Sequence, residues 1–297
     1  MYLKGRLGLE SARIPHADRH GMVWLAYGNL TVRQGTLTFD TAGFDDVPAG
    51  RYDIPFQAIS FVLLGPGTTV SHDALRLMAR HHTGLFAIGE DSVRLYASLP
   101  KPPDQSKRAR RHAELWGDAR KRLDVVRRMY AWRLGELVPS ADIAVLRGIE
   151  GARAREMYKQ LAAQYGVTWR GRRYDREKPE LTDRPNQAIN HAAVACYAAA
   201  NVAVNATGCI PQLGFIHEDS GEAFALDIAD LFRDTFTLPV AFEATKMVNK
   251  SPDDLLERTV RKLAAREIRR AQLVPTMIAR IKELLDADDP DRDQERP

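Results

Sequence analysis

A carboxylate in the apolar face of a predicted helix is the first residue that could do chemistry. Around LRGIEGARAREMYKQL, helical spacing places Glu150 in the middle of an apolar face made by Ile143, Leu146, Met157 and Leu161. A charge left unpaired there is costly, so a cation or strong hydrogen-bond donors must compensate it. Gly148 and Gly151 flank Glu150, and we expect them to leave room for close approach. A bound cation and an internal salt bridge to an arginine would satisfy Glu150 equally well.

A second cluster combines a histidine with three aspartates in the segment GFIHEDSGEAFALDIADLFRD. On a helix, Asp227, Asp230 and Asp234 follow at i, i+3 and i+7 and share one face. His217 lies just upstream, beyond a turn predicted at EDSG, and is near enough to fold back. Because like charges this close repel, the stripe suits either open solvent or a bound cation.

Taken together, these two clusters offer one glutamate, one histidine and two or three aspartates on neighbouring helices. Such a mixed oxygen and nitrogen site suits Mg²⁺ or Mn²⁺ better than zinc. A cation held in this way neutralises charge on a phosphodiester and activates an attacking oxygen. The two clusters therefore predict a site for phosphoryl transfer.

Basic side chains are concentrated in three places, and the chain carries a formal net charge of +4. The predicted helix 106–136 contains Lys107, Arg108, Arg110, Arg111, Arg120, Lys121, Arg122, Arg127, Arg128 and Arg133. A later helix stacks Arg258, Lys262, Arg266 and Arg269, and RGRR at residues 170–173 adds a basic loop. Charges on exposed helices are often only solubilising, but beside an acidic metal site they favour a phosphate-binding surface.

The elements that must position these residues change type along the chain. Up to residue 98 the segments MVWLAYGNLTV, GTLTFD, AISFVLLGPG, GLFAIG and SVRLYAS predict short strands, with one helix in SHDALRLMARHH capped by Ser71. Helical periodicity then covers residues 106–136, 142–165, 184–207, 222–235 and 252–286. We predict an α+β protein, with an N-terminal β-sandwich-like domain (residues 1–98) followed by a larger all-α catalytic domain (106–287). A proline-rich linker (99–105) separates them, and a disordered tail (288–297) ends the chain.

The two cysteines, Cys196 and Cys209, match no zinc-ligand spacing, and we expect both to be small core residues of a reduced protein. The chain shows no signal peptide and no run of membrane-spanning length. These features predict a cytoplasmic protein without a membrane segment.

The chain resembles, over nearly its whole length, the CRISPR-associated Cas-one integrase family, most closely its I-E subtype. The matching stretches include LAYGNLTV, PGTTVSH, SVRLYAS, LRGIEGARAR, QYGVTWRGRRYD, GFIH and LDIADLF. The resemblance implies a metal-dependent DNA endonuclease and integrase of CRISPR adaptation, which inserts short duplex DNA into the repeat array by transesterification with 3′-hydroxyl ends. It also implies a homodimer that joins a Cas-two family protein.

Carried over position by position, the resemblance makes Glu150, His217 and Asp230 the metal ligands and Asp227 an essential catalytic neighbour. Asp234 belongs to the stripe but not to the family pattern.

Four further positions match DNA-binding residues of the family. Tyr27 in LAYG matches an aromatic that stacks on the terminal base pair of the incoming DNA, although it could also be an ordinary tyrosine packed in the sandwich. Arg94 in SVRLYAS and Tyr197 in VACYAA match further functional positions, and Tyr197 could instead be helix core. Arg233 stands where a lysine is common, so the positive charge is kept.

Two other interpretations stay open from the sequence. The first is a general metal-dependent nuclease or branched-DNA resolvase, since the same site can activate water instead of a DNA hydroxyl. The second is a non-catalytic DNA-binding scaffold whose carboxylates are salt-bridged to neighbouring arginines. Metal dependence separates the scaffold from the two enzymes.

Overall fold

The computed structural model describes residues 21–90, 94–98, 106–135, 143–173, 182–251 and 255–286. The predicted linker 99–105 and the predicted tail 288–297 lie outside these ranges. The chain divides into two compact units between Ser106 and Lys107, with residues 206–208 grouped with the first unit. Within the described ranges, no helix combines the length and apolar character needed to cross a membrane.

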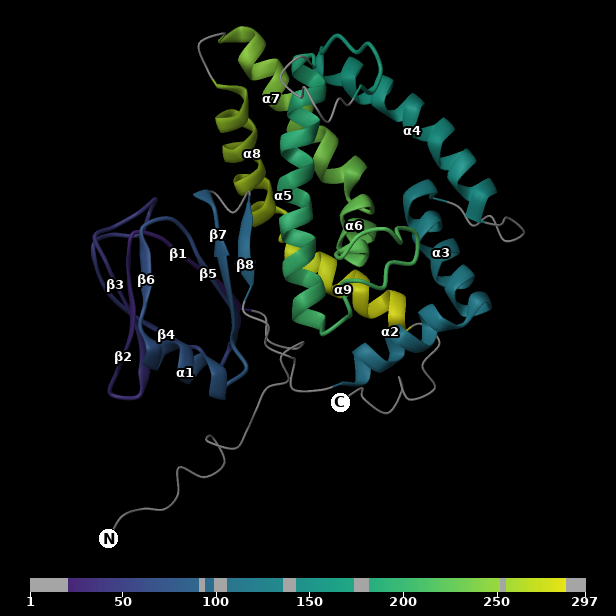
Figure 1. The fold of residues 1–297 in the computed structure, drawn as a ribbon. Helices are drawn as coiled ribbons and strands as arrows, with labels where there is room; N and C mark the ends of the chain where they lie inside the picture. The colour runs from purple at the N-terminus through teal and green to yellow at the C-terminus, as the bar shows by residue number, and fades with distance from the viewer. Residues whose placement is uncertain are drawn as a thin grey trace. The chain divides into compact units, whose positions relative to one another are not determined.

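The first unit consists of two four-stranded sheets and one helix (Figure 1). One sheet has the order β1-β5-β7-β8, from β1 (Gly21–Leu25), β5 (Ile59–Leu64), β7 (Gly84–Ile88) and β8 (Leu95–Ser98). The other has the order β4-β3-β2-β6, from β4 (Gly50–Ile54), β3 (Thr36–Thr41), β2 (Gly28–Arg33) and β6 (Thr68–Val70). Strand β4 was not predicted from the sequence. It lies at the edge of its sheet, and its residues GRYDI do not alternate between apolar and polar types.

The core of this unit lies between the two sheets. Leu30 and Phe39 from one sheet pack in the same buried cluster as Val62 and Leu64 from the other. Helix α1 (His72–Arg80) adds Ala74 and Met78 to that cluster, and the side chain of Ser71 caps it by accepting from the Ala74 N–H at 3.2 Å. The sandwich-like arrangement expected from the strand pattern is therefore present.

The second unit is helical. Its elements are α2 (Lys107–Gly117), α3 (Ala119–Leu134), α4 (Ile143–Tyr165), α5 (Arg184–Thr207), α6 (Ala223–Asp230), a π-helix (Arg233–Thr237), α7 (Leu238–Lys250), α8 (Leu256–Arg270) and α9 (Leu273–Asp286). Together with the sheets of the first unit, these helices confirm the α+β fold class, with strands first and helices after them.

Helix α5 is the centre of the helical unit (Figure 1). Its buried residues lie on several sides of the helix, and they include Ala188, Cys196, Ala198, Ala200 and Val204. A helix that is buried on several sides packs against several neighbours. The thiol of Cys196 on α5 lies 3.5 Å from the Ala229 carbonyl oxygen of α6, so α5 contacts the element that carries the aspartates. Both cysteines are buried and neither is in a disulfide, as the sequence predicted.

Three predicted helices differ from the structure. The stretch 106–136 is divided into α2 and α3, because Asp118 is extended and caps the start of α3. The stretch 252–286 is divided into α8 and α9, because Gln272 adopts a positive φ of 46° between them. The stretch 222–235 is not one α-helix either, because α6 ends at Asp230 and the π-helix begins at Arg233. Helix α7 was also not predicted from the sequence, and its Pro239 lies in the first turn, where proline is tolerated.

Candidate functional site

The carboxylate of Asp227 organises the loop that precedes α6. It is fully buried, and its two oxygens accept hydrogen bonds from three successive backbone N–H groups. Oδ2 accepts from Phe215 at 2.5 Å and Ile216 at 3.0 Å, and Oδ1 accepts from His217 at 3.0 Å. Every partner is a donor, so the buried charge is compensated by hydrogen bonds. Asp227 is therefore a structural anchor of the site and not a residue that faces solvent.

The same loop is held from its other side by side chains of three helices. The Trp116 indole N–H of α2 donates to the Gly214 carbonyl oxygen at 2.9 Å. Arg122 of α3 donates twice to the Phe215 carbonyl oxygen, at 3.1 and 2.9 Å, and Arg147 of α4 donates to that of Ile216 at 2.8 Å. Because its N–H groups and its carbonyl groups are both bonded, the backbone before His217 has little freedom to move.

His112 completes this support from α2. Its Nε2 donates to the Leu213 carbonyl oxygen at 2.8 Å, and its Nδ1 accepts from the Ile210 N–H at 3.2 Å. Burial lowers the pKa of His112 to about 4, although the bond to Leu213 and the charge of Asp227 oppose the shift. Only the neutral imidazole offers one donor and one acceptor, which matches both bonds.

His217 is oriented by Asp227. Its ring Nδ1 lies 2.7 Å from Asp227 Oδ1, and its side chain remains 40% exposed. The hydrogen bond to Asp227 raises the pKa of His217, burial opposes this, and the charge of Asp230 adds to the rise. Since Nδ1 is occupied, Nε2 is the ring nitrogen that can bind a metal or transfer a proton.

Glu150 and Asp230 come together around arginines. Arg133 of α3 places Nη2 at 2.5 Å from Glu150 Oε1 and Nη1 at 4.0 Å from Asp230 Oδ2. Arg233 places Nη2 at 2.5 Å from the other oxygen of Asp230. From the sequence, Arg133 was only one charge of a basic helix and had no place in the site. The internal salt bridge that was one alternative for Glu150 is thus observed.

The expected stripe of three aspartates on one helix is wrong. Asp227 points into the fold, Asp230 faces the arginines, and Asp234 lies on the π-helix after α6 has ended. A π-turn inserts an extra residue, so the i+7 spacing no longer returns to the same face. Burial raises the pKa of Asp234, and the charges of Arg133 and Arg233 oppose that rise.

The glycines beside Glu150 leave open space. A Cβ added at Gly148 or Gly151 would meet no other group within 4 Å, so the expected room is present and no described group occupies it.

The donor set fits a hard divalent cation. Two carboxylates and an imidazole whose second nitrogen is held by a carboxylate form the oxygen and nitrogen environment that Mg²⁺ and Mn²⁺ accept. The side chains of the site are not closed around a common point, since within the described ranges no three His, Cys, Asp or Glu side chains form a ready metal cluster. Arg133 and Arg233 bond the carboxylates instead.

The predicted DNA-binding residues are divided between the two units. Tyr27 and Arg94 belong to the first unit, and Tyr197 and Arg233 belong to the second. Tyr27 interrupts the expected strand 22–32 with a positive φ of 54° and is 48% exposed, so it is not packed in the sandwich. Arg94 is exposed just before β8. Tyr197 is half-buried, and its hydroxyl contacts the Glu222 carboxylate just before α6.

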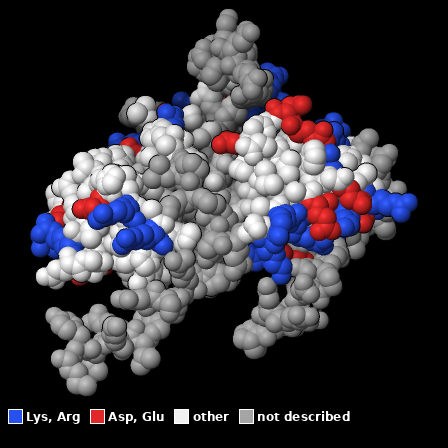
Figure 2. Space-filling model, turned by 60° about the horizontal axis from the view of Figure 1, so that its bottom comes forward, with Lys and Arg blue, Asp and Glu red and all other residues white. Residues whose placement is uncertain are grey.

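The basic helix 106–136 is less available to DNA than its composition indicates. Several of its arginines make bonds within the fold: Arg111 to the Leu285 carbonyl, Arg122 to the Phe215 carbonyl and Arg128 to the Leu284 carbonyl. On the face drawn in Figure 2, one group of Lys and Arg side chains is interleaved with Asp and Glu. By contrast, α8 exposes all four predicted basic residues, Arg258, Lys262, Arg266 and Arg269.

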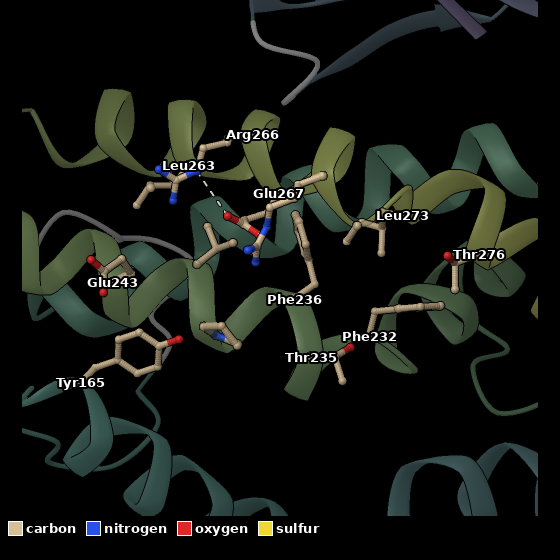
Figure 3. Close-up of a pocket in the computed structure, with 14 residues that line it drawn as sticks. Tyr165, Phe232, Thr235, Phe236, Glu243, Leu263, Arg266, Glu267, Leu273 and Thr276 are labelled. Atoms are coloured by element: carbon tan, nitrogen blue, oxygen red, sulfur yellow. Dashed lines mark hydrogen bonds and ion pairs between the residues drawn. The ribbon is translucent and has the colours of Figure 1, made fainter. Parts of the chain in front are cut away.

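A pocket of about 460 Å³ lies between the segment 232–243 and helices α8 and α9 (Figure 3). Phe232, Phe236 and Leu273 line it, and Glu267 is paired there with Arg266 and Arg270. None of Glu150, His217, Asp227 or Asp230 lines this pocket. The charged groups of this pocket are already in ion pairs, so His217 and its neighbours are the better candidates for the reaction site.

Comparison with known proteins places these observations in a family. The family model described as CRISPR associated protein Cas1 matches residues 132–273, which contain Glu150, His217, Asp227 and Asp230. The CRISPR-associated endonuclease Cas1 of Escherichia coli (strain K12) is 39% identical over 277 residues, covering 92% of this chain and 87% of that protein. The corresponding protein of Geobacter sulfurreducens is 37% identical, with the same coverage of 92% and 87%.

Solved structures agree with this relationship. The crystal structure of a TtCas1–DNA complex is similar with a TM-score of 0.80 and 29% identity, covering 90% of this chain and 97% of that one. A casposase bound to its integration product shares the fold, with a TM-score of 0.61 and 12% identity. The family and the enzymatic nature predicted from the sequence are thereby confirmed: this chain belongs to the family of CRISPR-associated Cas1 endonucleases.

Proposed function

We propose that this chain joins the 3′-hydroxyl ends of short duplex DNA to phosphodiesters of a CRISPR repeat, and so inserts new spacers into the array. The observation that carries the proposal is the arrangement around His217. Asp227 orients the imidazole, and the negative charge of Asp230 raises the pKa of that imidazole. Asp230 and Glu150 in turn both contact Arg133. One imidazole and two carboxylates from separate elements are thus brought into one neighbourhood.

We infer that Glu150, His217 and Asp230 hold Mg²⁺ or Mn²⁺ in the active enzyme. The cation, when bound, neutralises charge on the phosphodiester and lowers the energy needed to activate the attacking hydroxyl. Asp227 contributes by fixing the orientation of His217, since its Oδ1 bonds both the backbone N–H and the ring of that residue. Its role is therefore to position a ligand.

The reaction exchanges one phosphodiester bond for another, so it needs no external energy source. This agrees with the absence of a GxxxxGK[ST] phosphate loop from the sequence. The carbonyl and N–H bonds that hold the backbone of residues 213–217 would keep His217 in place while two DNA segments are aligned.

We propose that the DNA is bound through α8 and through Tyr27, Arg94, Tyr197 and Arg233. The exposed stack on α8 supports this, since its charges are spaced along one side of a helix and point to solvent. Tyr27 supports it as well, because it presents an exposed ring from a backbone conformation that few tyrosines adopt. The TtCas1 protein, which has the same fold, has been crystallised with DNA.

We further propose that the chain acts as a homodimer with a Cas2 family protein, because two DNA ends must be held at a set separation and one basic surface of this size cannot measure it. A solution mass measurement should give a dimer. A stable monomer that joins DNA alone would contradict the assembly.

The decisive experiment supplies a labelled duplex with free or blocked 3′ ends, a supercoiled plasmid carrying the repeat, Mg²⁺ or Mn²⁺, and the partner protein. Joined label should appear only with free hydroxyls. Equal nicking with blocked ends, and no joined label with free ends, would favour a hydrolytic nuclease or branched-DNA resolvase.

A non-catalytic scaffold is the second candidate, because the ion pairs of Glu150 and Asp230 with arginines are what that interpretation requires. The Asp230→Ala variant separates the two. On the integrase proposal it loses Mn²⁺ binding and joining but keeps DNA affinity, since the basic surface is unchanged. Joining at the wild-type level in this variant would remove Asp230 from the mechanism.

A further inference from the structure

Arg133 occupies an unusual position among the side chains of the site. Its side chain is only 7% exposed, and it contacts carboxylates from two different helices, Glu150 on α4 and Asp230 on α6. A buried guanidinium needs negative partners, and a pair of close carboxylates needs a positive one. Arg133 therefore acts as the internal counter-ion of the carboxylate pair.

The hydrogen bonds of Arg133 are incomplete. Its Nε is buried and has no hydrogen-bond partner among the described residues. The same holds for Oδ1 of Asp234, which is also buried. The charge of Arg133 lowers the pKa of the Asp234 carboxyl more than the charge of Arg233 does. A buried donor and a buried acceptor of opposite charge thus lie in one neighbourhood without bonding each other.

The π-helix explains why Asp234 is placed there. In a continuous α-helix Asp234 would follow Asp227 and Asp230 on their face, but α6 ends at Asp230 and the π-helix begins at Arg233. π-turns are uncommon and cost stability, so they persist mainly where the displaced side chain has a use. Asp234 contributes no ligand to the proposed cation site.

A divalent cation and a guanidinium compete for the same carboxylate oxygens. Two like charges held a few ångströms apart repel strongly in a buried environment. If Glu150 and Asp230 hold a cation, Arg133 must give up its ion pair with Glu150. The carboxylate of Asp234 can then serve as its partner, because it has a buried oxygen without a hydrogen bond and the charge of Arg133 already lowers its pKa.

We propose that Arg133 is a switchable counter-ion: it neutralises Glu150 and Asp230 until a divalent cation binds, and it then transfers its ion pair to Asp234. Arg133 and Asp234 are in this account positioning residues that set the affinity for the cation. The inference rests on the proposed metal site.

The test measures Mn²⁺ binding to the full chain by calorimetry and by the paramagnetic resonance signal of free Mn²⁺. Arg133→Gln removes the competitor, so Mn²⁺ should bind roughly tenfold or more tightly than to the wild type. Asp234→Asn removes the second ion-pair partner, so Mn²⁺ should bind several-fold more weakly. In the double variant, Asp234→Asn should no longer weaken Mn²⁺ binding, because Arg133 is absent and no longer needs a second partner.

Unchanged or weaker Mn²⁺ binding by Arg133→Gln would overturn the proposal, and so would an Asp234→Asn penalty of equal size in both backgrounds. Glu150→Gln tells this failure from failure of the metal site. If Glu150→Gln binds Mn²⁺ as the wild type does, the metal site itself is wrong. If Glu150→Gln abolishes binding while Arg133→Gln does not tighten it, only the switch is wrong.

Removing a buried arginine could prevent folding, so the design includes a variant that keeps the charge. Arg133→Lys retains a competing cation, and its Mn²⁺ affinity should stay closer to that of the wild type than that of Arg133→Gln. The rise in melting temperature on adding Mn²⁺ gives an independent measure of affinity for each variant. If Arg133→Gln is not folded, wild-type Mn²⁺ affinity in the Asp234→Asn variant overturns the proposal by itself.

Discussion

Asp227 Oδ1 bonds His217 twice, accepting from its backbone N–H at 3.0 Å and lying 2.7 Å from its ring Nδ1. A single buried carboxylate therefore sets both the main-chain position and the ring orientation of the histidine. The geometry explains how a residue that does not face solvent can be essential to the site.

Asp227→Asn should destabilise the protein and disturb the site. An amide offers one oxygen and directs its NH₂ group at backbone donors, so at least one buried N–H loses its partner. We expect a loss of roughly 2–4 kcal/mol in the free energy of unfolding, together with loss of DNA joining. Asp124→Asn is the matched control, since Asp124 is exposed and forms a surface ion pair with Arg127. Chemical denaturation measures both, and equal stability of the two variants would contradict the role of Asp227.

His112 should make the stability of the protein depend on pH. Its pKa is about 4 in the folded protein, against an ordinary value of 6.5 for histidine. Because the folded value is the lower one, the unfolded chain binds the extra proton between these values. The stabilisation is therefore complete above pH 6.5 and is lost as the pH falls towards 4, by about 3 kcal/mol.

Urea denaturation of the wild type and of His112→Gln at about pH 7, 5.5 and 4 measures this effect. The difference in stability between the two proteins should shrink as the pH falls, since glutamine does not titrate. A constant difference across the three pH values would show that His112 is not the group responsible.

The glycines of the helical unit should respond in opposite ways to alanine. Nothing within 4 Å opposes a Cβ at Gly148 or Gly151 in α4, so each alanine should stabilise the helix by about 0.5–1 kcal/mol. At Gly214 a Cβ would lie 2.2 Å from the His217 carbonyl oxygen, so Gly214→Ala should disrupt the loop. Melting temperatures of the three variants test the contrast, and a fall for Gly148→Ala would refute the open-space argument.

Tyr27→Ala should weaken DNA binding without unfolding the β-unit. Base stacking on an aromatic side chain is worth about 1–3 kcal/mol, so the affinity for a short blunt duplex should fall about tenfold. Tyr96, which is 67% exposed, gives the control variant Tyr96→Ala. Fluorescence anisotropy with a labelled duplex compares them. Equal losses for the two variants would mean that Tyr27 has no special role.

The α8 charges should determine the salt dependence of binding. Replacing Arg258 and Lys262 with glutamine should reduce the slope of log affinity against log salt by about 1 for each phosphate that is no longer neutralised. Arg76→Gln on α1 removes the same kind of charge outside the predicted basic clusters and should leave the slope unchanged. An unchanged slope in the α8 double variant would assign the DNA to another surface.

Periodicity and local chemistry in the sequence were enough to predict that strands come first and helices after them, and to predict the cap at Ser71. They were also enough to single out Glu150, His217, Asp227 and Asp230 as residues whose types suit a hard cation. These features depend on residues close together in the chain, where spacing translates directly into a shared face. The burial of Cys196 and Cys209 was equally predictable, because cysteines outside disulfides and metal sites are usually small core residues.

What the tertiary structure alone decided depends on interactions between residues far apart in the chain. No spacing rule could show that Arg133 bonds Glu150 and lies 4.0 Å from Asp230, since residue types alone do not choose between a salt bridge and a cation. The same applies to α2–α4, whose Trp116, Arg122 and Arg147 bond the His217 loop, so that Arg122 is held within the fold although its charge suggested a surface for DNA. The break after Asp230 was likewise not predictable, because a π-turn has no sequence signature. It moves Asp234 away from the face that an unbroken helix would give it.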